Sequence, residues 1–186
     1  MRPDGGTAAD VRDNGGEPFV GRLAELERLE GLWQNAIDGT GAVVFITGES
    51  GIGKTALARA FLRRVRSLHP DFIVCRGRCV EQYGTGEAYL PFLDALGTLL
   101  VGPGREPTTR LLRTYAPTWC LQLPAISVSP DTQQVLRDQT IGATKERMLR
   151  EMGDTFEAAA ASAPLVGLLE DVQWADPSSV ELLRHI

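Results

Sequence analysis

The fold of this chain is decided by residues 42–55, which read AVVFITGESGIGKT. Residues 42–47 form a short apolar and β-branched run, which is typical of a strand covered on both faces in a parallel sheet. Glycines follow at once, and residues 56–68 then carry apolar side chains at helical spacing until His69 and Pro70 end the pattern. The stretch therefore predicts a strand, a glycine-rich turn and a helix in direct succession.

The turn matches the pattern G-x-x-x-x-G-K-[ST], the Walker A phosphate-binding loop. Its glycines allow backbone angles closed to other residues, so that successive N–H groups can point at phosphate oxygens. Lys54 is expected to hold the β- and γ-phosphates, and Thr55 to offer its hydroxyl to Mg²⁺. Because the chain has seventeen arginines and only two lysines, a lysine at this position supports function over coincidence. The predicted cradle consists of Gly48, Glu49, Ser50, Gly51, Ile52, Gly53, Lys54 and Thr55.

A second apolar run, residues 165–169, ends in two carboxylates, Glu170 and Asp171. Parallel strands deliver ligand-binding groups at their carboxyl ends. Since adjacent residues of a strand point to opposite sides, we expect Glu170 to face the Mg²⁺ shell near Thr55 and Asp171 to activate the attacking water. The order of the two acids stays open, and Lys54, Glu170 and Asp171 are the candidate catalytic residues.

The remaining pattern predicts an α/β fold. Helices are expected over residues 22–37, 91–100 and 132–161, the last with a bend or break near Gly142 or Gly153. A further strand is expected over residues 72–75, and Asp176-Pro177 should begin a final helix in which Ser178 and Glu181 form a capping box. Strands and helices alternate, which indicates a parallel sheet in a three-layer αβα sandwich.

Composition and charge narrow the class of protein. With 186 residues, 43% hydrophobic and 23% charged, the chain predicts one globular domain over residues 17–186, after a disordered tail at residues 1–16. The net charge of −5 argues against a nucleic-acid surface. No run approaches the ~18 apolar residues of a membrane helix, and no signal peptide is evident. We therefore expect a cytoplasmic protein without membrane or direct nucleic-acid contact.

Three groups of residues are interpreted as structural. The thiols of Cys75, Cys79 and Cys120 lack zinc-ligand spacing and are predicted to be reduced. The basic cluster Arg63, Arg64 and Arg66 is interpreted as a solvated face near a helix C-terminus. Three tryptophans are expected to serve in packing: Trp33, Trp119 and Trp174.

Three segments together carry a resemblance to a known family: residues 19–22, which read FVGR, the cradle, and residues 168–177, which read LLEDVQWADP. From about residue 17 onward the chain resembles the AAA-type, origin-recognition-complex-like ATPase domain of the signal-transduction ATPases with numerous domains (STAND). The resemblance implies ATP and Mg²⁺ as ligands, with Val20 and Gly21 beside the adenine. The family usually has Asp at the metal position, whereas this chain has Glu170.

The resemblance also implies partners. Family members join this domain to LuxR-type or winged-helix DNA-binding domains, to class III nucleotide cyclases or to protein kinases. A nucleotide-dependent oligomer is also compatible with the resemblance. Such a sheet needs about five parallel strands, and the sensor strand, the arginine that answers the γ-phosphate and the helical lid would follow Ile186. We therefore expect the chain to be the N-terminal part of the domain, with weak nucleotide binding and little turnover on its own.

The sequence lacks the motifs that are typical of other nucleotide-binding classes. A GTPase would need an Asn-Lys-x-Asp type guanine reader, and a transporter ATPase a Leu-Ser-Gly-Gly-Gln signature; neither occurs in the sequence. A small-molecule kinase stays formally open. The alternative from a different class is a regulatory switch that binds ATP without significant hydrolysis. The sequence does not separate switch from motor.

Overall fold

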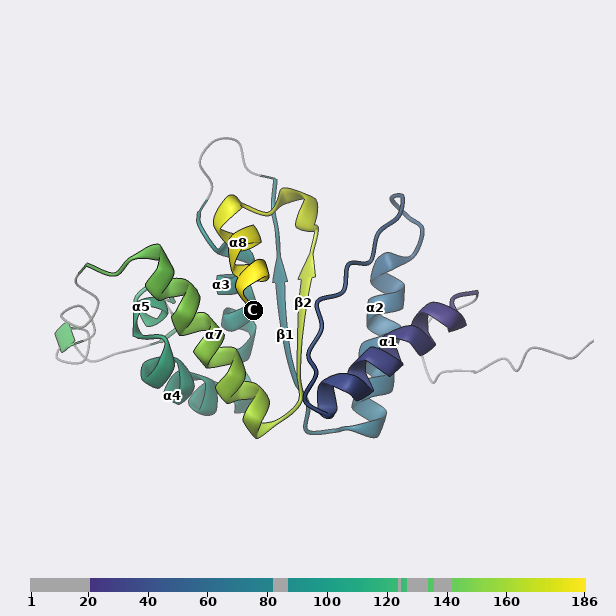
Figure 1. Ribbon diagram of the computed structural model, residues 1–186, viewed down its shortest axis with the longest axis horizontal. Coiled ribbons are helices and arrows are strands. Elements are labelled where there is room, and N and C mark those ends of the chain that lie inside the picture. Colours follow the sequence, from purple (N-terminus) through teal and green to yellow (C-terminus); the bar gives the residue numbers. More distant parts are fainter. Residues whose placement is uncertain (1–20, 82–86, 124, 127–133, 136–141) are drawn as a thin grey trace, which may run out of the picture. The chain divides into compact units, whose positions relative to one another are not determined.

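The computed structural model describes residues 21–81, 87–123, 125–126, 134–135 and 142–186 (Figure 1). The chain divides into two compact units, Met1–Leu68 and His69–Ile186, each with a hydrophobic cluster of its own. The expected tail at residues 1–16 and the expected adenine contact Val20 lie outside the described residues. In the described ranges, no helix is long and apolar enough to cross a bilayer.

The first unit is built on a helix pair, α1 (Leu23–Ile37) and α2 (Lys54–Leu68), and both helices confirm the predicted ranges. The ring of Trp33 meets that of Phe61 edge-on, with centroids 6.4 Å apart, which supports the packing role predicted for this tryptophan. The buried centre of the pair consists of Leu26, Leu57 and Ala60.

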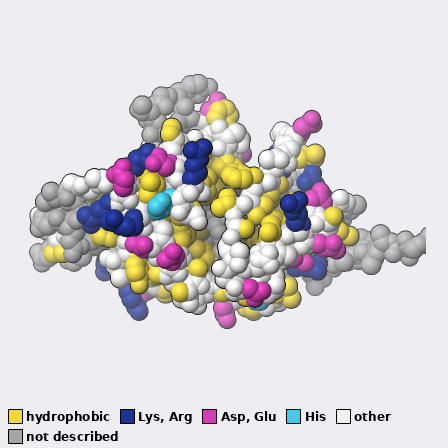
Figure 2. All heavy atoms as spheres, in the orientation of Figure 1, with side chains coloured by type: hydrophobic (Ala, Val, Ile, Leu, Met, Phe, Trp, Pro, Cys, Tyr) yellow, Lys and Arg dark blue, Asp and Glu magenta, His cyan; other side chains and the backbone are white. Residues whose placement is uncertain are grey.

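The strand predicted at residues 42–47 is wrong in this structure. The segment connects α1 to the phosphate loop and pairs with no strand in the described part of the chain. Val43, Val44 and Phe45 are 52%, 45% and 67% exposed, and hydrophobic side chains reach the surface in this region (Figure 2). An apolar, β-branched run favours an extended backbone, but a strand also needs a neighbour for its N–H and C=O groups.

The second unit is organised by two parallel strands, β1 (Ile73–Arg78) and β2 (Leu165–Glu170). Their register runs from Ile73 opposite Leu165 to Arg78 opposite Glu170. Both strands and the parallel arrangement were predicted, although β1 continues to Arg78 instead of ending at Cys75. The extra residues bring an arginine to the edge of the sheet where the acidic pair begins.

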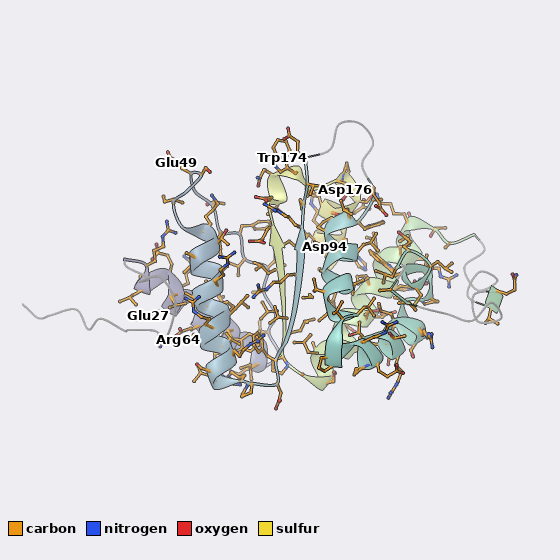
Figure 3. The ribbon with its side chains drawn as sticks, turned by 180° about the vertical axis from the view of Figure 1, so that it is seen from behind. Glu27, Glu49, Arg64, Asp94, Trp174 and Asp176 are labelled. Atoms are coloured by element: carbon orange, nitrogen blue, oxygen red, sulfur yellow. The ribbon has the colours of Figure 1, made fainter. Side chains whose placement is uncertain are left out.

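Helix α3 (Leu90–Leu99) covers the outer edge of β1 and confirms the predicted helix near residues 91–100. The backbone N–H of Arg78 donates to Oδ2 of Asp94 at 2.9 Å, and that of Arg76 donates to the hydroxyl of Thr98 at 3.3 Å. Figure 3 shows Asp94 on this helix beside the strands. Side chains of α3 therefore supply hydrogen-bond acceptors that a third strand would otherwise provide.

The crossover between the strands is helical, as a parallel connection requires. Its described elements after α3 are η1 (Gly102–Gly104), α4 (Arg105–Tyr115), α5 (Pro117–Cys120) and α7 (Lys145–Ser162). They enclose a core around Trp119, which has no exposed surface. The sequence did not reveal α4 and α5, because Gly, Pro and Thr obscure the periodicity there.

The long helix predicted over residues 132–161 is present only from Lys145 onward, and most of residues 132–141 lie outside the described ranges. The predicted break is confirmed at Gly142, whose φ of +72° does not fit a right-handed helix. Thr144 then caps α7 by accepting a hydrogen bond from the N–H of Arg147. Gly153 stays inside α7.

A buried carboxylate, Glu151, joins α5 to α7. It accepts hydrogen bonds from the N–H of Thr118 at 3.0 Å, from the Thr118 hydroxyl at 2.9 Å and from Nε of Arg147 at 2.8 Å. Three donors, one of them charged, compensate the desolvation of the carboxylate. The contact therefore fixes the short helix α5 against α7.

The three cysteines are buried and free. Burial raises the pKa of the Cys75 thiol and of the Cys120 thiol to about 11. Both are therefore neutral near pH 7, which fits the predicted reduced, structural thiols.

Replacing Gly77 by alanine should destabilise the second unit. A Cβ at Gly77 would lie 1.7 Å from the carbonyl oxygen of Pro91 and 2.8 Å from its carbonyl carbon, so β1 and α3 would have to separate. We expect Gly77→Ala to lower the free energy of unfolding by about 3 kcal/mol, measured by urea denaturation followed by circular dichroism. Gly97→Ala on α3, where an added Cβ meets nothing within 4 Å, is the matched control and should not destabilise. Equal stabilities of the two variants would contradict this packing.

Candidate nucleotide-binding site

The predicted phosphate loop lies in the first unit, between residue 47 and the first residue of α2. Three of its glycines have positive φ: +147° at Gly48, +78° at Gly51 and +93° at Gly53. Residues other than glycine rarely adopt such backbone angles, so the loop has the conformation that the glycine pattern predicted. Glu49 lies at the tip of this loop, beyond the start of α2 (Figure 3).

Lys54 is the first residue of α2, and its side chain turns back over the loop. Its Nζ donates to the carbonyl oxygens of Gly48 and Glu49, both at 2.9 Å. Thr55 follows in the first helical turn with an exposed side chain. The Lys54 ammonium and the Thr55 hydroxyl therefore belong to the first two residues of α2, where the backbone N–H groups carry positive partial charge.

The loop is also held from outside by Arg22, which sequence reasoning did not single out. One terminal nitrogen of its guanidinium donates to the carbonyl oxygen of Ile52 at 2.7 Å. Arg22 immediately precedes α1 and follows Gly21, which has a φ of +90°. The signal that could have indicated it is its place in the FVGR box.

The acidic pair lies in the second unit, where β2 ends. Glu170 is the last residue of β2, and Asp171 has left-handed backbone angles, φ 57° and ψ 40°. The strand therefore stops at Glu170, and simple alternation along a strand does not set the direction of Asp171. The left-handed turn sets it, together with the hydrogen bond that the carboxylate accepts.

That hydrogen bond comes from Arg78, at the end of the neighbouring strand. Its Nε lies 2.9 Å from Oδ2 of Asp171, while the register places Arg78 opposite Glu170. The hydrogen bond to Asp171, followed by the charges of Asp171 and Glu170, raises the pKa of the Arg78 guanidinium. A permanent positive charge thus accompanies both carboxylates, which sequence reasoning missed because it ended β1 at Cys75.

The segment after the acids forms η2 (Val172–Trp174) and leads into α8 (Pro177–His185). A pocket of about 260 Å³ lies beside it, lined by residues 173–177 together with Cys79, Glu87 and Pro91 among others. Trp174 is 48% exposed, in contrast to the buried Trp33 and Trp119. Its packing is therefore only partial.

Asp176 caps α8 and ties it to α3. Its carboxylate accepts from the N–H groups of Ser178 and Ser179, both at 3.0 Å, and from the N–H of Tyr89 at 3.3 Å. The predicted capping box of Ser178 and Glu181 is therefore wrong. Pro177 is the first residue of α8, so the cap is Asp176, two residues before the predicted Ser178.

Glu181 forms an ion pair with Lys145 instead. The predicted site residues thus fall into two groups, with the cradle in the first unit and Glu170 and Asp171 in the second. In the described ranges, no group of three or more His, Cys, Asp and Glu side chains forms a metal cluster. In both units, positive and negative side chains are interspersed on the face drawn in Figure 2.

A glycine-rich loop directly before a helix, and a parallel strand that ends in paired acids, are typical of an α/β protein of the P-loop class. The family described as "AAA ATPase domain" matches residues 18–186, and the chain belongs to this family. Membership confirms the P-loop NTPase fold that the sequence predicted and supports a nucleotide-binding module.

One relative is a protein of Rhizobium meliloti (strain 1021), described as uncharacterized protein R02095. It is 27% identical to this chain over 176 residues, covering 90% of the chain and 17% of the relative. The chain therefore spans less than a fifth of that relative's length. No solved structure matches the chain.

Removing the cap should loosen the segment that follows the acids. We expect Asp176→Ala to lower the free energy of unfolding by about 2 kcal/mol, because it leaves the first N–H groups of α8 and that of Tyr89 without their acceptor. Thermal and urea denaturation would measure the change. Asp154→Ala, at an exposed position of α7, is the control and should be near neutral. Equal free energies of unfolding for the two variants would show that the Asp176 carboxylate does not stabilise α8.

Proposed function

We propose that this chain is the Mg-ATP-binding module of a signal-transduction or transcription regulator, in which ATP binding and hydrolysis act on an output domain. The observation that carries the proposal is the phosphate loop: three glycines at positive φ followed by Lys54 at the first position of α2. Such a loop presents backbone N–H groups and an ammonium to phosphate oxygens.

The chemistry of the predicted site residues suits these ligands. In this proposal Lys54 binds the β- and γ-phosphates and Val20 and Gly21 contact the adenine. Thr55 and Glu170 supply the hydroxyl and carboxylate oxygens that Mg²⁺ prefers. The bound cation would offset charge on the phosphates. Asp171 accepts a proton from the attacking water, and Arg78 orients this carboxylate through its Nε.

The regulatory part of the proposal rests on two supports. The FVGR and QWADP segments resemble STAND regulators, and the Rhizobium meliloti relative is far longer than the region it shares with this chain. We propose a DNA-binding or nucleotide cyclase output domain and a nucleotide-dependent oligomer as the partners of this module.

The second candidate function is a switch that binds ATP without significant hydrolysis, and the Arg78–Asp171 pair favours it. Oδ2 of the Asp171 carboxylate already accepts a charge-assisted hydrogen bond from Arg78 at 2.9 Å, so fewer of the carboxylate's acceptor positions are open to an attacking water. The Arg78–Asp171 pair would slow ATP hydrolysis without affecting the binding of ATP at the phosphate loop.

Lys54→Ala should weaken Mg-ATP binding by about 10- to 100-fold, because it removes a charged hydrogen-bond donor to the phosphates. Isothermal calorimetry would measure the affinity, with GTP and with ATP plus EDTA as parallel titrations that test base preference and metal dependence. Lys145→Ala is the matched control, since it removes the chain's other lysine, whose partner is Glu181.

Lys54-dependent binding that favours ATP over GTP and needs Mg²⁺ would support the module. Binding that Lys54→Ala and Lys145→Ala reduce equally would refute the cradle. So would the absence of any heat from folded wild-type protein at millimolar ATP.

Asp171→Asn separates the two candidate functions. If the chain hydrolyses ATP, this variant should keep its Mg-ATP affinity but lose roughly 100-fold or more in the rate of phosphate release, measured in single-turnover experiments. Asp154→Asn should behave like the wild type. A wild-type protein that binds Mg-ATP but releases no phosphate would instead support the switch.

A further inference from the structure

The hydrogen bond from Arg22 to the phosphate loop joins two parts of the first unit that lie 30 residues apart in sequence. The guanidinium belongs to a partly buried residue at the start of α1, and the acceptor is the carbonyl oxygen of Ile52, in the turn just before Lys54. At 2.7 Å this is a short, charge-assisted bond.

The bond fixes a peptide plane and not only a carbonyl. The carbonyl of Ile52 and the N–H of Gly53 belong to one planar trans peptide, so they point in opposite directions. While Arg22 holds the carbonyl on one side, the N–H of Gly53 must face the other. If the plane turned over, a carbonyl oxygen would point where the donor had been and would repel a phosphate.

The loop needs such an anchor because its own backbone does little to hold it. Among the described residues, the backbone–backbone hydrogen bond within the loop runs from the N–H of Ile52 to the carbonyl of Glu49 and is long, at 3.4 Å. Gly51 and Gly53, on either side of Ile52, have positive φ and no Cβ to restrict rotation. An external guanidinium therefore decides the orientation of this peptide.

We propose that Arg22 is a positioning residue for the phosphate cradle, which aims the Gly53 N–H at the phosphates by holding the Ile52 carbonyl. This rests on the proposed nucleotide-binding function and adds a regulation to it. Arg22 directly follows Gly21, a proposed adenine contact, so a shift of the base-binding segment would alter the peptide that faces the phosphates. Base recognition and phosphate affinity are thereby coupled through one side chain.

The test compares Arg22→Ala with Arg22→Lys and with Arg28→Ala, which removes an exposed arginine of α1. Each protein is titrated with Mg-ATP and with Mg-tripolyphosphate, which has the phosphates but no base. Amide NMR spectra of the ¹⁵N-labelled free proteins report on Gly53 directly. Thermal denaturation shows that each variant is folded, and if Arg22→Ala does not fold, Arg22→Lys serves in its place.

We expect Arg22→Ala to weaken both ligands by about tenfold and to shift the Gly53 amide resonance, because one charge-assisted hydrogen bond is lost. Arg22→Lys should restore part of the affinity, and Arg28→Ala should match the wild type. A merely structural role would lower the melting temperature without changing the affinity of the folded protein.

The failures are distinguishable. Wild-type protein that binds neither ligand refutes the proposed function, and the role of Arg22 falls with it. Lys54-dependent binding that Arg22→Ala leaves unchanged refutes only the role of Arg22. Weakened ATP binding with unchanged tripolyphosphate binding and an unshifted Gly53 amide would place Arg22 at the base end alone and overturn the positioning role.

Discussion

Parallel pairing of β1 with β2 is the constraint on which the second unit depends. Parallel neighbours cannot be joined by a tight turn, so the chain has to leave the sheet after Arg78 and return at Leu165. It does so through the helices that close a core around Trp119. The pairing then sets what meets at the carboxyl edge, because the same register that places Arg78 opposite Glu170 also brings the Arg78 guanidinium to Asp171.

The edge of β1 that faces away from β2 packs against α3. Gly77 lets the strand approach the backbone of Pro91, and acceptors on α3 satisfy the outward N–H groups of β1. Tyr89 immediately precedes the same helix, and its N–H donates to the Asp176 carboxylate after the acidic pair. The positions of the strand edge, the acidic pair and α8 are therefore determined together. A substitution at Gly77 that moves α3 would also displace the residues at the carboxyl edge of the sheet.

The first unit is constrained differently, because a glycine-rich loop can adopt many backbone conformations. Side chains from the elements around it restrict that freedom. Lys54 reaches back to the carbonyls of Gly48 and Glu49, and Arg22 reaches across to that of Ile52. The glycines permit the cradle's backbone angles, but charged residues at the starts of α1 and α2 select among them.

The sequence by itself determined the local elements and indicated which residues would form the cradle, since glycine spacing, helical periodicity and apolar runs are properties of short segments. It predicted α1, α2, α3, β1 and β2, and it placed Lys54 at a helix start. It could not supply a partner for residues 42–47, whose apolar pattern favours extension but not pairing. Only the tertiary structure decided that Arg78 meets Asp171, that Asp176 rather than Ser178 caps α8, and that Arg22 holds Ile52. Each of these contacts joins distant segments or selects one of two nearby polar residues according to backbone geometry, which a one-dimensional pattern does not contain.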